Sequence, residues 1–180
     1  VRYSDYDAIV LRHGGANDAP ISQLYRVEVL RNRLSHVGQR PLRSEHGMAV
    51  TVGFPAVAHV AGNVLDRVWG AGLFIFGGKG SGQEGERALS RILIHHNKVT
   101  HPLLNTNDWG GIETWQGGPH YVYNNISGNP GGYWHWKHLS RPDIENRDAA
   151  TARFGFAIYL DGSFKNYVFN NIAWGKSNDL

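Results

Sequence analysis

Two acidic residues, Glu113 and Asp161, lie in two stretches of the chain that have similar sequences. A seventeen-residue stretch aligns without a gap with a later one, so that Glu113 stands opposite Tyr159 and Trp115 opposite Asp161. If the two stretches form adjacent β-strands, these four side chains share one face, and the Cα atoms of the two acids lie about 8 Å apart. Glycoside hydrolysis uses such a carboxyl pair, in which one acid protonates the leaving oxygen and the other is nucleophile or base.

Aromatic and polar residues suited to sugar binding surround this pair in the sequence. Flat aromatic faces stack on the C–H faces of sugar rings, and polar tips hydrogen-bond to hydroxyl groups. Five candidates fall in residues 131–153, a loop insertion that would roof a groove beside the acids; alternatively, its two tryptophans only shield the side of the domain. The candidate sugar contacts are Asp108, Trp115, His120, Tyr133, Trp134, His135, Trp136, His138 and Tyr159.

Repeated units must position these residues. Residues 111–127 align with 157–173, and residues 49–65 show the same spacing of apolar residues. Units of this kind cannot bury their apolar side alone, so we expect them to stack as a solenoid of parallel strands ~4.8 Å apart. An ordinary antiparallel β-protein with Asn turns is the alternative, but it gives no reason for the gapless match. The inward residues expected from the alignment are Ile112, Thr114, Val122, Ile126, Ile158, Leu160, Val168 and Ile172.

An asparagine recurs at one position of the unit, at intervals of 31, 34, 28 and 46 residues. In a stack of parallel strands, equivalent amides lie over one another and form a hydrogen-bonded ladder. Asparagine also tolerates the left-handed backbone that a sharp bend needs. The five residues are Asn32, Asn63, Asn97, Asn125 and Asn171.

These repeats resemble those of the right-handed, pectate-lyase-like parallel β-helix families, in which a GIYL-D-G pattern is followed by V-NN-I. Here the pattern is carried by Ile158-Tyr159-Leu160-Asp161-Gly162 and by Val122-Tyr123-Asn124-Asn125-Ile126, and the resemblance covers residues 25–175. It implies an all-β chain, a right-handed parallel β-helix of four to five rungs, with the hand also favoured for parallel crossovers. We expect one domain, residues 1–180, with an irregular segment 1–20 and the insertion 131–153.

The fold that the resemblance implies supports several functions, so it does not select one. We expect a carbohydrate-active enzyme that hydrolyses glycosidic bonds of a polysaccharide or oligosaccharide with Glu113 and Asp161. A uronate polysaccharide lyase or epimerase is a second interpretation, in which a base removes the C5 proton. A non-catalytic adhesin, surface module or filament scaffold is a third, with self-association through open solenoid ends. The lyase would use His120, Arg153, Tyr159 and Lys165.

A metal site is not favoured by the sequence, despite ten histidines. No HExxH or similar ligand set is present, and the adjacent His95 and His96 would point to opposite faces of a strand. We therefore expect no resident metal ion. Calcium, which many lyases of the resembling fold use, is the alternative cofactor, with oxygen ligands from Asp108, Glu113 and Asp161.

Composition sets outer limits on these interpretations. The 180 residues are 41% hydrophobic and only 18% charged, with 23 glycines, which argues against a helical bundle, a coiled coil and a disordered chain. No apolar run approaches the ~20 residues of a membrane helix. A net charge of +3 without a dense basic run does not favour nucleic acid. The chain opens at Val1 without an initiator Met or signal peptide and stops at Leu180 directly after a strand-like pattern, so we expect a processed or incomplete chain. The absence of cysteine is compatible with export, and we expect a secreted, extracellular or periplasmic protein.

Overall fold

The computed structural model describes residues 1–12, 24–40, 47–77, 90–106, 108–132 and 155–175. Within these ranges the chain forms sixteen β-strands and no helix. The strands lie in three sheets, which we call A, B and C, and every neighbouring pair of strands is parallel. The all-β parallel solenoid expected from the sequence is confirmed.

Each turn of the solenoid contributes one strand to each sheet, so strands three apart in sequence are neighbours in space. Sheet A contains β1 (Arg2–Ser4), β4 (Arg33–Val37), β7 (Val64–Val68), β10 (Lys98–Thr100), β13 (Ile126–Gly128) and β16 (Ile172–Trp174). Sheet B contains β2 (Ile9–Leu11), β5 (Val50–Gly53), β8 (Leu73–Phe76), β11 (Trp109–Trp115) and β14 (Gly155–Asp161). Sheet C contains β3 (Leu24–Leu30), β6 (Pro55–Ala61), β9 (Arg91–His95), β12 (His120–Tyr123) and β15 (Asn166–Phe169).

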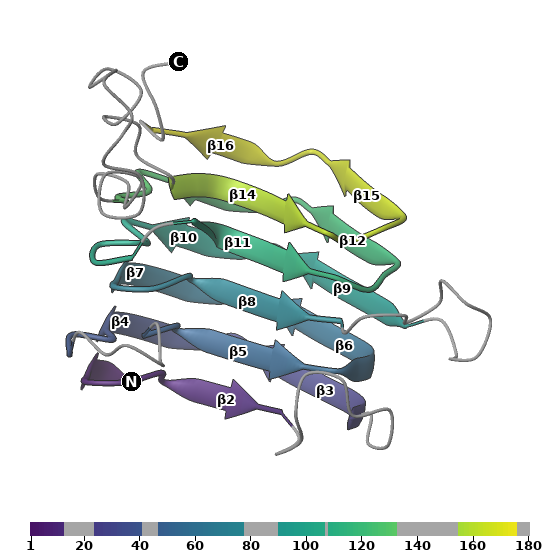
Figure 1. Cartoon of the computed structure of the whole chain (residues 1–180), viewed down its shortest axis with the longest axis horizontal. Helices are drawn as coiled ribbons and strands as arrows, with labels where there is room; N and C mark the ends of the chain where they lie inside the picture. The colour runs from purple at the N-terminus through teal and green to yellow at the C-terminus, as the bar shows by residue number, and fades with distance from the viewer. Residues whose placement is uncertain (13–23, 41–46, 78–89, 107, 133–154, 176–180) are drawn as a thin grey trace, which may run out of the picture.

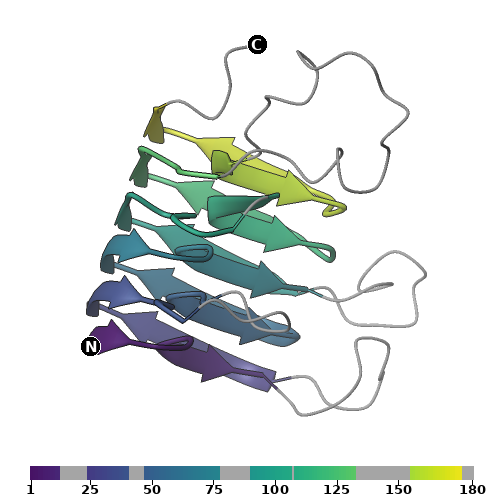
Figure 2. The same cartoon turned by 60° about the vertical axis from the view of Figure 1, so that its left-hand side comes forward.

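The turns stack in chain order, from the first turn at one end to the last at the other (Figure 2). In Figure 1 the strands of sheet B run from left to right in front, and the chain returns behind them through sheets C and A while it rises. This path is right-handed. The strand register agrees with the internal alignment, since Ile112 pairs with Ile158 and Val122 with Val168.

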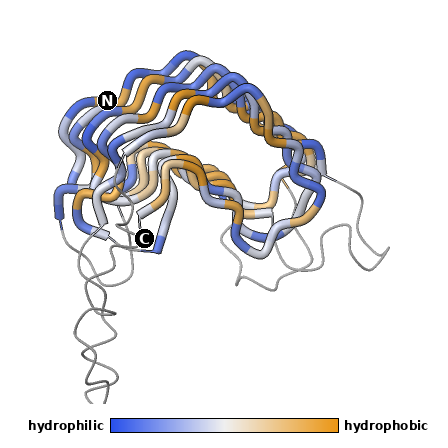
Figure 3. Tube along the Cα trace, turned by 90° about the horizontal axis from the view of Figure 1, so that it is seen from above, coloured by the Kyte–Doolittle hydropathy of each residue, from blue (hydrophilic) through white to orange (hydrophobic). Residues whose placement is uncertain are grey.

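Valine, isoleucine and leucine side chains of successive turns fill the interior. Figure 3, which looks along the stack, shows hydrophobic residues lying over one another from turn to turn. Among the predicted inward residues, Ile112, Thr114 and Val122 are fully buried and Ile158 is half-buried. Alternating β-branched residues in parallel strands therefore produce the core, as the repeat predicts.

Three of the predicted core residues are exposed and a fourth, Ile126, is half-buried but points outward, for two different reasons. Leu160 and Val168 are 37% and 43% exposed because they lie in the last described turn, which no later described strand covers. For Ile126 and Ile172 the predicted direction is wrong. In sheet A it is Ser127 that is fully buried, in register with the buried Val99, so the isoleucine before it points outward.

The asparagine ladder is confirmed along its whole length. Each side-chain amide donates to the Oδ1 atom of the asparagine in the next turn, at distances of 2.9, 2.9, 3.0 and 3.0 Å from Asn32 through to Asn171. From Asn63 onward it also donates to a backbone carbonyl of sheet C, such as Val60 O for Asn97. The ladder thus satisfies buried polar groups at the corner between sheets C and A.

The left-handed residue of this corner is not the ladder asparagine but the residue before it. Arg31, Gly62, His96, Asn124 and Asn170 all have φ between 53° and 70°. A side chain in this conformation leaves the alternation of the strand, so parity arguments from the sequence fail at the corner.

Candidate active site

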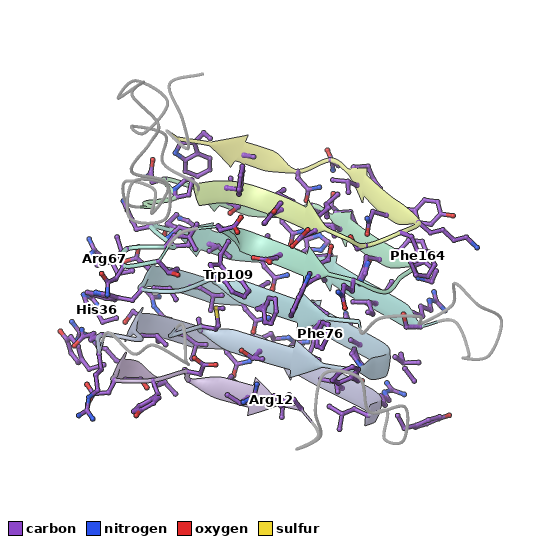
Figure 4. The ribbon with its side chains drawn as sticks, in the orientation of Figure 1. Arg12, His36, Arg67, Phe76, Trp109 and Phe164 are labelled. Atoms are coloured by element: carbon purple, nitrogen blue, oxygen red, sulfur yellow. The ribbon has the colours of Figure 1, made fainter. Side chains whose placement is uncertain are left out.

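The candidate acids lie on the outer face of sheet B, on adjacent strands. Glu113 of β11 is in register with Tyr159 of β14, and Trp115 with Asp161, as the alignment predicts. On the other side of β11, Glu113 is in register with Phe74 of β8, a turn that the alignment did not reveal. This face is turned toward the viewer in Figure 4, where Trp109 and Phe76 are labelled.

Glu113 is buried although it is on the outside of the solenoid, with 2% of its surface exposed. Its Oε2 atom accepts a hydrogen bond from the backbone N–H of Gly110 at 2.8 Å. Burial raises the pKa of Glu113 to about 8; the Gly110 hydrogen bond opposes this change, and the charges of Asp161 and Asp108 add to it. Glu113 is therefore mostly protonated at neutral pH.

Gly110 permits this close arrangement because it has no side chain. A Cβ atom at this position would lie 2.8 Å from the Cβ atom of Tyr159. Any larger residue would push β14 away from the backbone N–H that holds Glu113. Gly110 is thus part of the site.

The second acid, Asp161, is less buried than Glu113 and ends β14. It lies near enough to Glu113 and Tyr159 for its charge to raise the pKa of both side chains. Asp108, predicted as a sugar contact, also belongs here, since the Tyr159 hydroxyl donates a hydrogen bond to its carboxylate. Burial, followed by the three nearby carboxyl groups, raises the pKa of the Tyr159 phenol to about 12.

A cluster of aromatic rings lies beside the acids on the same face. Phe74 contacts Trp109 edge to face at 5.0 Å between ring centroids, and Phe76 stacks on Trp115 at 4.7 Å. Phe54 extends the cluster by an edge contact with Phe76. Phe74 and Phe76 are buried while both tryptophans stay partly exposed, so the tryptophans form the outer surface of the cluster.

Phe74 and Phe76 are members of this site that the sequence analysis missed. The signal was present in the run Leu73-Phe74-Ile75-Phe76, where the two aliphatic residues are inward and the aromatic residues take the outward positions of the strand.

One predicted sugar contact is wrong. His120 is fully buried inside the solenoid, where Nδ1 contacts Asn166 Oδ1 at 2.9 Å and burial lowers its pKa to about 4. Its register with Ile92 and Asn166 turns the side chain inward, away from any substrate. The insertion residues Tyr133, Trp134, His135, Trp136 and His138, and Arg153 of the lyase interpretation, lie outside the described residues.

The expected separation of His95 and His96 is also wrong. Because His96 is in the left-handed corner, its ring turns back, and the two Nδ1 atoms are 2.8 Å apart. His59 of the preceding turn reaches the other side of His95, with 2.7 Å between the Nε2 atoms. Nevertheless, in the part of the chain that the structure describes, no group of three or more His, Cys, Asp or Glu side chains is arranged to hold a metal ion.

Comparisons with protein-family models, with curated proteins and with solved structures found no significant match. Among the described residues, no helix is long and apolar enough to cross a membrane. The interpretation of the site therefore depends on its geometry.

Proposed function

We propose that this protein is a carbohydrate-active enzyme that hydrolyses glycosidic bonds of a polysaccharide on the outer face of sheet B. In this proposal Glu113 is the general acid and Asp161 is the nucleophile or base. The observation that carries it is the contrast between two neighbouring carboxyl groups, one buried and protonated, the other more exposed. In glycoside hydrolases, two nearby carboxyl groups in different environments usually take different roles, one as general acid and the other as nucleophile or base.

The surroundings of the pair support a sugar as the substrate. Trp109 and Trp115 offer partly exposed aromatic surface within the same face, and Tyr159 and Asp108 offer polar groups beside it. Aromatic faces with adjacent polar groups bind the two kinds of surface that a sugar ring presents. Together with the resemblance of the repeats, this supports our proposal of a pectate-lyase-like β-helix protein with a secreted, extracellular or periplasmic location.

The lyase or epimerase alternative has less support. A lyase needs a base at the surface, but His120 is inside the solenoid and the raised pKa of Tyr159 disfavours the phenolate form. Arg153 lies outside the described residues, so Lys165, which is exposed, is the described candidate that is left. Calcium remains a prediction, which activity before and after treatment with a chelator would test.

A scaffold function is favoured by one observation, the apolar surface of the last described turn. Tyr167, Val168, Phe169, Ile172 and Trp174 are all at least 42% exposed there. An uncovered strand edge with such residues supports addition of another β-structure. We keep self-association as the alternative if no polysaccharide is cleaved.

The test is a screen of neutral and uronate polysaccharides, scoring new reducing ends and the ultraviolet absorbance of unsaturated lyase products. On a cleaved substrate, Glu113→Gln and Asp161→Asn should each lower kcat by about 10²–10⁴-fold, the contribution of general acid–base catalysis. Activity of the wild type should fall as the pH rises through about 8, because Glu113 then loses its proton. Glu28→Gln, at an exposed glutamate of sheet C, is the control.

Near-normal turnover by both variants would show that the pair is not catalytic. Unsaturated products would support the lyase, and no cleavage of any polysaccharide would leave the scaffold as the better explanation.

A further inference from the structure

A second surface, on the outer face of sheet A, carries a pocket of about 510 Å³. Its volume is within the ~300–1,000 Å³ that is usual for ligand sites. It lies at the start of the solenoid, on β1, β4 and β7, and not on the sheet that holds Glu113. Its polar lining is mostly basic and consists of Arg2, Arg33, Ser35, His36, Asp66 and Arg67.

The repeat places one arginine from each of three successive turns at this pocket. Arg2 is in β1, Arg33 in β4 and Arg67 in β7. His36 and Arg67 have left-handed φ values of 56° and 53°, so both are corner residues, and Figure 4 shows them at the same edge of the molecule. The three arginines are staggered across neighbouring turns that are ~4.8 Å apart, since Arg2 is in register with Ser35 whereas Arg33 is in register with Val64.

Two of the three arginines have no carboxylate partner within the described residues, while Arg67 pairs with Asp66. Asp66 is the one acid that lines the pocket, and its carboxylate already contacts Arg67, Thr100 and His101. The guanidinium of Arg2 lies over the Tyr3 ring at 4.9 Å, and no carboxylate among the described residues pairs with it or with Arg33.

We propose that this pocket binds the oxyanions of an anionic polysaccharide, either sulfate esters or carboxylates. Guanidinium groups match such oxyanions with paired hydrogen bonds, and Ser35 adds a hydroxyl donor. Cations spread over three neighbouring strands at staggered positions fit a polymer with repeated charges better than a single small anion. The site goes beyond the proposed hydrolysis, because it is on another sheet and binds without turnover.

The surface favours a polysaccharide over a single-stranded nucleic acid. Base recognition by such proteins needs aromatic faces on which bases stack. The aromatic ring beside this pocket, Tyr3, is already in contact with the His36 ring at 4.9 Å and with the Arg2 guanidinium.

The experiment measures binding by isothermal titration calorimetry at two salt concentrations, with turnover blocked by Glu113→Gln. The probes are a heparin-derived oligosaccharide, an oligogalacturonate, a neutral cello-oligosaccharide and an oligothymidylate. We expect one or both anionic sugars to bind, more weakly at high salt because screening reduces the attraction. Binding of the heparin probe alone identifies sulfate esters as the ligand group, and binding of the oligogalacturonate alone identifies carboxylates.

Two variants and a matched control locate the binding. Arg33→Gln and Arg67→Asn should each weaken binding about 5- to 30-fold, the loss of one charge-assisted contact. Arg91→Gln removes the same charge from an exposed position of sheet C and should change nothing. Asparagine suits position 67 because it tolerates the left-handed backbone.

The proposal is overturned if neither anionic sugar binds, if the neutral sugar binds equally well, or if Arg91→Gln weakens binding as much as the pocket variants. Tighter binding of oligothymidylate, lost in Arg33→Gln, would reassign the pocket to nucleic acid. Failure of the proposed hydrolysis would not affect this test, because the binding titrations use Glu113→Gln and do not depend on turnover.

Discussion

Replacing Glu113 by glutamine should stabilise the folded protein at neutral pH. The pKa of this carboxyl group is raised from its ordinary value of 4.5 to about 8 in the folded state, first by burial. The folded protein therefore holds a proton that the unfolded chain releases between these two pH values. By linkage, the stability that Glu113 contributes is complete below pH 4.5 and is lost progressively as the pH rises to about 8.

The size of the effect follows from the same two values. At pH 7 an ordinary glutamate is about 2.5 pH units above its pKa, while Glu113 is still mostly protonated. At 1.36 kcal/mol for each unit, the penalty in the free energy of unfolding reaches roughly 3 kcal/mol. Glutamine resembles the protonated acid in shape and its Oε1 atom can still accept from Gly110, so Glu113→Gln should recover much of this.

The assay is urea denaturation of the wild type and of Glu113→Gln at several pH values from 5 to 8. The wild type should lose stability relative to the variant as the pH rises, and the two should be most similar at pH 5. Glu28→Gln, at an exposed position, should run parallel to the wild type. If the stability of Glu113→Gln changed with pH in the same way as that of the wild type, Glu113 would not be a buried, protonated acid, and its proposed role as general acid would be refuted.

Two further predictions concern the solenoid itself. Ile112→Ala should lower the free energy of unfolding by about 2–5 kcal/mol, because the side chain is fully buried. Ile172→Ala, at a residue that is 60% exposed, should lower it by less than about 1 kcal/mol. Equal losses of the two variants in urea denaturation would contradict the outward direction assigned to Ile172 in sheet A. Asn97→Ala should lower the free energy of unfolding by about 3 kcal/mol, since in a buried corner it removes the amide donor to Val60 O and the acceptor of the Asn63 backbone N–H, and one of the two acceptors of the Asn63 side-chain amide. Asn32→Ala, at the exposed end of the ladder, should cost about 1 kcal/mol, and a similar loss for both asparagines would argue against a buried ladder.

The candidate site was predicted only in part. Strand parity placed Glu113 and Asp161 correctly, because both lie in the regular strands of sheet B. The strict alternation of side chains gave the wrong direction for Ile126, which follows the ladder asparagine Asn125, and for His96, which is the left-handed residue of its corner. His120 was predicted as a surface contact from its side-chain chemistry alone, although the alternation from the inward Val122 places it inside the solenoid.

What the sequence by itself determined was the parallel stack. A repeated asparagine and a gapless match between two units fix which residues lie over one another, because equivalent positions of parallel strands must be in register. The tertiary structure alone decided that an outward glutamate is buried. Phe74 comes from the preceding turn, Tyr159 from the next, and the Gly110 N–H from a bend of the same strand. The pKa of an acid depends on the water that such neighbours exclude, and that exclusion is a property of the assembled face.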